Sequence, residues 1–108
     1  AAQSDVIYIP TDNTAASCSE TIGNIVREKK VPVVAGEQGI CAGCGVATLS
    51  ISYYDLGVKT GEMAAKILKG EEKISEMPIE YATATKMYNP AICEELGITV
   101  PEGYTAIE

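Results

Sequence analysis

The chain has 108 residues, a length that suits one small α/β domain, and 46% of them are hydrophobic. Its net charge is −7, and its one basic cluster is residues 27–30. Binding to a phosphate backbone or an anionic bilayer needs Lys and Arg gathered on one face, so neither nucleic acid nor a charged membrane surface is an expected partner. Apolar runs such as residues 31–35 are too short to span a bilayer.

The first half of the chain alternates between strand and helix patterns. Residues 5–10 predict a strand that ends at Pro10, and residues 11–13 are of the types that begin helices. Apolar residues at helical spacing predict a helix from about 14 to 30. A buried strand is expected over 31–35, closed by Gly36. Residues 37–45 hold three glycines and two cysteines, which predicts a loop with about one helical turn.

The second half continues the alternation. A third strand is expected over 46–52, and Ser52 begins a helix over 53–69 that Gly70 ends. Residues 71–77 predict a charged loop and residues 78–84 a fourth strand. The pair Asn89-Pro90 starts a short helix to Leu96, and residues 98–108 form a tail.

This order predicts the α/β class, as a three-layer fold with a mostly parallel sheet flanked by helices. We expect a single α/β unit over 1–108. In such sheets ligands bind at the carboxyl ends of the strands. Three segments qualify: residues 11–14, 36–39 and 52–55.

The segments at these strand ends carry a family resemblance. Residues 5–14, 31–37 and 47–57 resemble the substrate-binding proteins of tryptophan- and tyrosine-type ABC importers, and the similarity continues through residues 61–70, 77–80 and 96–101. The resemblance implies a type I periplasmic-binding-protein fold with two α/β lobes. It also implies that the chain is the C-terminal portion of such a protein, mostly its second lobe, with the helix over 53–70 belonging to the first.

The same resemblance implies a function without catalysis. A member of this family captures a small solute by lobe closure, here an aromatic amino acid or a similar compound, and delivers it to the ABC permease. No cofactor is expected. The location is extracytoplasmic, either periplasmic or as a membrane-anchored lipoprotein in the full-length protein. A hydrolase or transferase is not expected, because the chain has no His, no nucleophile elbow and no phosphate loop.

Eight residues at the strand ends are candidates for ligand binding, and each also has a plain structural interpretation. Residues 11–14 can cap a helix, Glu37 can be a solvated loop charge, and the Tyr pair can be packing. The family carries Asp where this chain has Ser52, which leaves the ligand class open. The candidates are Thr11, Asp12, Asn13, Thr14, Glu37, Ser52, Tyr53 and Tyr54.

The cysteines depart from the family pattern. Cys41-Ala-Gly-Cys44 is a C-x-x-C motif, so the alternative function is a redox or metal-binding protein. Zinc would need two more ligands, and only Cys18 and Cys93 remain in a chain without His, so no metal site is expected. Buried thiols or a disulfide in an oxidising compartment are the other interpretations.

The helix over 53–69 also predicts an assembly. It presents an apolar face, and the remainder of the chain offers no obvious cover for it. A homodimer that buries this face is therefore expected. The face consists of Leu56, Met63, Ala64, Ile67 and Leu68.

Overall fold

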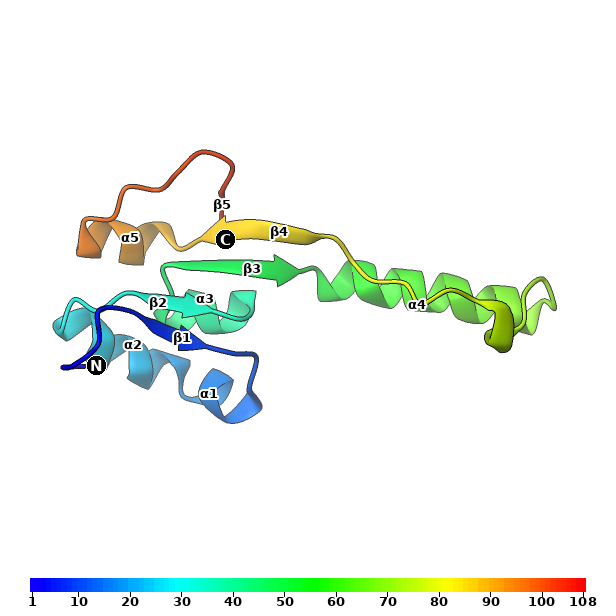
Figure 1. The fold of residues 1–108 in the computed structure, drawn as a ribbon, viewed down its shortest axis with the longest axis horizontal. Coiled ribbons are helices and arrows are strands. Elements are labelled where there is room, and N and C mark those ends of the chain that lie inside the picture. Colours follow the sequence, from blue (N-terminus) through cyan, green and yellow to red (C-terminus); the bar gives the residue numbers. More distant parts are fainter. The chain divides into compact units, whose positions relative to one another are not determined.

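The computed structural model describes all of residues 1–108, and the chain divides into two compact units. Unit 1 comprises residues 1–50 and 85–108, and unit 2 comprises residues 51–84. Each is described by itself below, and Figure 1 labels their elements. No helix is both long enough and apolar enough to cross a membrane.

A five-stranded sheet organises unit 1, with the strands in chain order across it. The neighbours β1 and β2 are parallel, as are β2 and β3, and β4 and β5. The end of β4 lies beside the start of β3, because the Asn89 amide donates to the Val46 carbonyl at 3.0 Å, so these two strands run in opposite directions (Figure 1). The predicted α/β class with a mostly parallel sheet is confirmed. The strands are β1 (Ile7–Ile9), β2 (Val33–Ala35), β3 (Ala47–Ile51), β4 (Ala84–Tyr88) and β5 (Thr105–Ala106).

Four helices belong to unit 1: α1 (Asn13–Ser17), α2 (Ser19–Glu28), α3 (Gln38–Cys44) and α5 (Pro90–Leu96). The single helix expected from 14 to 30 is divided at Cys18, which has non-helical dihedrals. Ser17 donates its hydroxyl to the Thr14 carbonyl, a local bond that competes with the helical pattern. Lys30 then adopts a positive φ of 52° and Pro32 follows, so α2 ends.

The main core of unit 1 lies between the sheet and the pair α2 and α3. Its buried members are Val26, Val33, Ala35, Ile40, Cys41 and Cys44. A loop with about one helical turn was expected over 37–45, but the helical part is longer, because residues 38–44 all form α3. Three of its side chains fill the core, and this burial outweighs the low helix propensity of Gly39 and Gly43.

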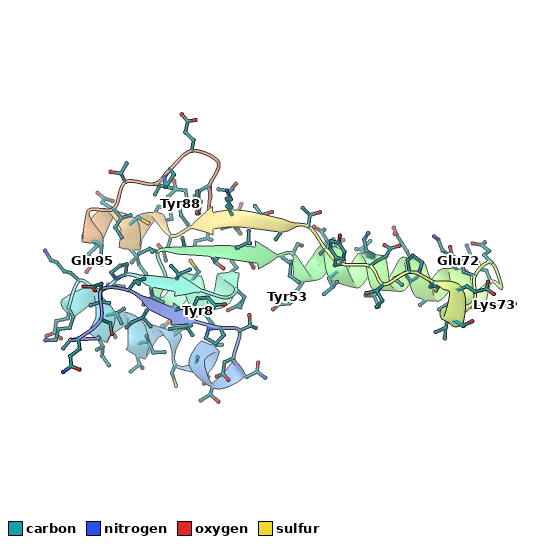
Figure 2. All side chains as sticks on the ribbon, in the orientation of Figure 1. Tyr8, Tyr53, Glu72, Lys73, Tyr88 and Glu95 are labelled. Carbon is teal, nitrogen blue, oxygen red and sulfur yellow. The ribbon has the colours of Figure 1, made fainter.

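Helices cover one face of this sheet. The register sets Tyr8 beside Val34 and Val34 beside Ala47, so these side chains share the other face with Leu49. Tyr8, Val34 and Leu49 are 66%, 37% and 61% exposed, and Tyr8 is labelled on β1 in Figure 2. Unit 1 therefore supplies one of the two helical layers expected around the sheet.

Unit 2 is built around α4 (Tyr53–Leu68), the helix expected over 53–69, followed by a short turn of 3₁₀ helix (Ile74–Glu76). The strand expected over 78–84 was wrong: the strand is β4, which begins at Ala84, and Ile79 is 95% exposed. Lys59 on α4 pairs with Glu80 at 2.8 Å, which holds the extended segment beside a helix. A helix has no free backbone edge, so the alternating pattern here has no strand partner.

Candidate functional site

The carboxyl ends of β1 and β2 meet at one edge of unit 1, which we call the carboxyl edge and define as residues 10–14, 36–39 and Ser50. The two loops touch because Gly36 has no side chain. Its amide donates to the Ile9 carbonyl at 2.8 Å, and a Cβ at Gly36 would lie 2.6 Å from the Thr11 nitrogen. This spacing is available only to glycine, so Gly36 brings the loop of Asp12 against the loop of Glu37.

Asp12 is the N-cap of α1. Its backbone is extended, and its Oδ1 accepts a hydrogen bond from the Ala15 amide at 2.8 Å. The side chain is exposed, as are those of Thr11, Asn13 and Thr14. The capping role expected for this segment is therefore confirmed, and the carboxylate also faces solvent.

Glu37 is the N-cap of α3, a role usually taken by shorter side chains. Its Oε2 accepts from the Gly39 amide at 2.8 Å, and its Oε1 accepts from the Ile40 amide. The carboxylate is half-buried and neutralises the N-terminus of its own helix. Each carboxylate oxygen has a second lone pair that can accept from a ligand donor.

Ser50 belongs to the carboxyl edge but is not among the eight candidates named from the sequence. Its side chain is 4% exposed, and its Oγ accepts from the Gln38 amide at 3.2 Å, which joins the end of β3 to the start of α3. A pattern in the sequence of β3 could have indicated Ser50: hydroxyl side chains occur at alternate positions, Thr48 and Ser50, and alternate positions of a strand share one face. Both side chains point to the helix-covered face.

The other three candidates belong to unit 2. Ser52 is the N-cap of α4, and its Oγ accepts from the Asp55 amide at 3.1 Å, as the predicted capping motif requires. Tyr53 and Tyr54 occupy the first turn of α4 and are 59% and 80% exposed. Tyr53 is labelled in Figure 2. Their rings are free to meet a ligand or another surface.

The charges at the carboxyl edge are all negative. Residues 10–14 and 36–39 include Asp12 and Glu37 and no basic side chain. In unit 1 the cations are Arg27, Lys29 and Lys30, at the C-terminal end of α2, and Lys86 in β4. Because α2 returns across the sheet to begin β2, its C-terminal end lies at the opposite edge. The carboxyl edge is therefore suited to a cationic group such as an ammonium.

Two hollows in unit 1 lie away from the candidate residues. One of about 460 Å³ is on the helices and is lined by Ser19, Glu20, Asn24, Arg27, Gly39, Ala42 and Gly43. Another of about 240 Å³ is on the uncovered sheet face and is lined by Val34, Ala47, Thr48, Leu49, Lys86 and Tyr104. Arg27, which lines the first, forms an ion pair with Glu95 at 2.9 Å.

The cysteines are free thiols, with Cys18 exposed and the other three buried. No group of three or more acidic or cysteine side chains is arranged to hold a metal ion. Burial and the neighbouring Cys44 and Cys93 raise the pKa of the Cys41 thiol to about 12. A thiol with so high a pKa is almost entirely protonated at neutral pH, and the thiolate is the reactive form.

Comparison with known proteins places this geometry in one family. A family model described as "ABC transporter substrate binding protein" matches residues 1–106. A curated relative, the tyrosine-binding protein of Clostridioides difficile strain R20291, is 32% identical over 83 residues, which cover 77% of this chain and 24% of the relative. The chain therefore spans about a quarter of that relative's length.

Solved structures show the same similarity. The ligand-free, open structure of a substrate-binding protein with adhesive properties from Clostridium difficile is 39% identical, with a TM-score of 0.76 over 95% of this chain and 36% of that one. An ABC domain from Streptococcus pneumonia in complex with L-Trp is 34% identical, with a TM-score of 0.79 over 97% and 37%. A conserved domain protein from Vibrio cholerae O1 biovar eltor is 30% identical, with a TM-score of 0.80 over 99% and 38%.

Proposed function

Because the chain belongs to the family of ABC transporter substrate-binding proteins, we propose that it forms part of a binding site for an aromatic amino acid and performs no catalysis. One relative is a tyrosine-binding protein, and one structural neighbour was solved with L-Trp. In the full-length protein, the ligand is captured by lobe closure outside the cytoplasm and delivered to the ABC permease. Such a protein is periplasmic or anchored as a lipoprotein.

The observation that carries this proposal is the carboxyl edge itself. Two loops from neighbouring parallel strands meet there through Gly36, and each presents a carboxylate, from Asp12 and Glu37. Both carboxylates already satisfy the amides of their own helices, so a ligand carboxylate would meet negative charge. The carboxyl edge accordingly accepts the α-ammonium group of the amino acid.

The domain assignment is part of the same proposal and rests on the family resemblance. Unit 1 represents most of the second lobe present in the chain, the helix α4 of unit 2 belongs to the first lobe, and Ser52, Tyr53 and Tyr54 are the candidate ligand contacts of unit 2. Tyr53 and Tyr54 supply exposed rings for stacking on an aromatic side chain. Sites of this kind bury most of the ligand surface, so one edge alone binds weakly.

A titration of the isotope-labelled chain, followed by the shifts of its backbone amides, tests the proposal. L-Tyr, L-Trp and tyramine share the ammonium group, and we expect each to shift amides of residues 11–14 and 36–39, with millimolar affinity. The compound 3-(4-hydroxyphenyl)propionate has the ring and the carboxylate but no amine, and it should leave these amides unchanged. Shifts confined to Ser19, Glu20, Asn24 and Arg27 of the hollow on α2, or a response to the propionate alone, would reject the assignment.

Two substitutions separate ligand binding from folding. In Asp12→Asn the side-chain carbonyl can still accept from the Ala15 amide, while the negative charge is lost. In Glu37→Gln one carbonyl can replace only one of the two bonds to the Gly39 and Ile40 amides, so Asp12→Asn is the cleaner test. We expect Asp12→Asn to keep the amide spectrum of unit 1 and each variant to bind tyramine about threefold more weakly, since threefold is about 0.7 kcal/mol and an exposed ion pair contributes about 0.2–1 kcal/mol. Unchanged tyramine binding in both variants would mean that the carboxylates do not hold the ammonium.

The homodimer expected from the sequence is also retained as a proposal. On α4, Leu56, Met63 and Ile67 are half-buried, while Leu68 is 88% exposed. A dimer would cover these residues. Light scattering over a dilution series decides this, with Leu68→Asp expected to favour the monomer; a chain that stays monomeric at high concentration would exclude it.

A further inference from the structure

Three cysteines are buried inside unit 1, and the proposed function does not use them. Cys41 and Cys44 are 0% exposed, and Cys93 is 4% exposed. Every one of these thiols donates to a backbone carbonyl. The pairs are Cys41 with Gly45 at 3.5 Å, Cys44 with Ile40 at 3.3 Å, and Cys93 with Val46 at 3.4 Å.

The side chain of Asn89 forms hydrogen bonds to the C-terminal end of α3, next to these thiols. Asn89 is 7% exposed, and its Nδ2 donates to the carbonyls of Cys41 and Ala42, both at 3.2 Å. Its Oδ1 accepts from the Ile92 amide at 3.3 Å, as the N-cap of α5. The Cys41 carbonyl also accepts from the Gly45 amide at 3.0 Å, so Asn89 adds a second bond there, and it supplies the Ala42 carbonyl near the end of the helix with a partner.

Side chains therefore hold α3 at both ends, with Glu37 at its start and Asn89 at its finish. The helix has seven residues, and Gly39 and Gly43 are among them. A helix this short is not stable by itself, and glycine is a poor helix former. Ile40, Cys41 and Cys44 of α3 are fully buried in the main core, so α3 opens only rarely and together with that part of the core.

We propose that α3 is an oxidation-sensitive latch. While it is closed, Cys41 and Cys44 stay reduced in the presence of an extracellular oxidant of the disulfide class, such as glutathione disulfide. When it opens, the same oxidant joins the two sulfurs, and the disulfide prevents α3 from closing and displaces Glu37 from its cap. The effect on ligand binding rests on the proposed function, whereas the thiol chemistry does not.

The chemistry balances by two successive exchanges. One cysteine thiolate attacks a sulfur of glutathione disulfide, forming a mixed disulfide and releasing one glutathione thiolate. The thiolate of the second cysteine then attacks the protein sulfur of the mixed disulfide and releases the second glutathione. The two cysteines lose two electrons and two protons, and glutathione disulfide gains them as two glutathione thiols.

Two physical reasons link the thiols to the closed state. Cys41 and Cys44 are three residues apart on one face of α3, where Cβ atoms are about 5–6 Å apart, whereas a disulfide needs about 3.5–4.5 Å, so the bond cannot form without distorting the helix. A disulfide also removes both S–H donors, including the one that the Cys41 thiol gives to the Gly45 carbonyl. Buried carbonyls without partners are unfavourable, so the oxidised pair disfavours the closed helix.

Thiol-resolved mass spectrometry after treatment with glutathione disulfide tests the latch. In the native chain we expect Cys18 alone to react quickly, because it is exposed, and Cys41 and Cys44 to form a disulfide only slowly. Asn89→Ser keeps an N-cap residue for α5 and loses both donors to α3, so Cys41–Cys44 oxidation should become at least about tenfold faster. Asn24→Ser, at an exposed Asn on α2, is the matched control and should leave the oxidation rate unchanged.

Three results would overturn the latch. The first is alkylation of Cys41 and Cys44 as fast as that of Cys18 in the native chain. The second is an oxidation rate that Asn89→Ser leaves unchanged, and the third is an oxidised chain that retains the native amide shifts of residues 37–45. The tyramine titration repeated on the oxidised chain separates the two proposals. If the reduced chain gives no tyramine response, the proposed function fails while the thiol results still decide the latch.

Discussion

Replacing Thr48 with Val should stabilise unit 1. The Thr48 side chain is 2% exposed on the helix-covered face of β3, and its Oγ1 has no hydrogen-bond partner. A buried hydroxyl without a partner costs about 1–3 kcal/mol, and the methyl group that replaces it adds about 0.8 kcal/mol of apolar burial. After allowance for imperfect packing, we expect a gain of about 1–2 kcal/mol.

Urea unfolding, followed by the amide signals of unit 1 and unit 2 separately, measures this gain. With a slope of about 1–3 kcal/mol per molar urea, the unit 1 midpoint should rise by roughly 0.5–1 M and the unit 2 midpoint should not change. Ser50→Ala is the matched comparison, because Ser50 accepts from the Gln38 amide, and its loss should lower the unit 1 midpoint. The reasoning is refuted if Thr48→Val lowers the midpoint, which would mean that the hydroxyl is satisfied.

Other substitutions probe the loops, the thiols and unit 2. Gly36→Ala should destabilise unit 1 by about 1–3 kcal/mol in urea titrations, whereas Gly61→Ala, with nothing within 4 Å of the added Cβ, should stabilise α4; equal effects would contradict this. The pKa of Cys41, about 12, exceeds the usual thiol value of about 8.5, so the unfolded chain loses this proton at a lower pH than the folded chain does. The free energy of unfolding therefore falls as the pH rises from about 8.5 towards 12. Cys41→Ala should flatten this alkaline decline, and an unaltered slope would argue against it. Lys59→Ala should release the segment around Glu80 and make its amides exchange faster at low salt; exchange that is the same in both chains would show that the ion pair does not hold it.

Local signals explain what the sequence predicted correctly. The caps at Asp12, Ser52 and Asn89 depend on a few neighbouring residues, so their spacing identifies the starts of α1, α4 and α5. The order of strands and helices follows from hydrophobic periodicity, which is also local. These features were sufficient for the α/β class.

Long-range pairing explains the errors. Ile79 and Tyr81 alternate as strand residues do, but a strand needs a partner edge, and this segment lies beside α4. Glycines suggested a loop over residues 37–45, while the core formed by β2 and α2 decides that α3 is a helix. At the carboxyl edge, Glu37 was a candidate by position, but its contact with its own helix and the role of Ser50 depend on how β3 packs against α3.

The path of the chain through unit 2 has a consequence for protein engineering. The chain leaves unit 1 after β3 and re-enters it at β4, and these two strands are neighbours in the sheet. Unit 2 thus occupies the position of a hairpin loop. A shortened chain in which a two-residue turn joins Ile51 to Ala84 would make unit 1 a continuous miniprotein. Comparison of its amide spectrum with that of the parent chain would show whether the sheet and helices of unit 1 fold without unit 2.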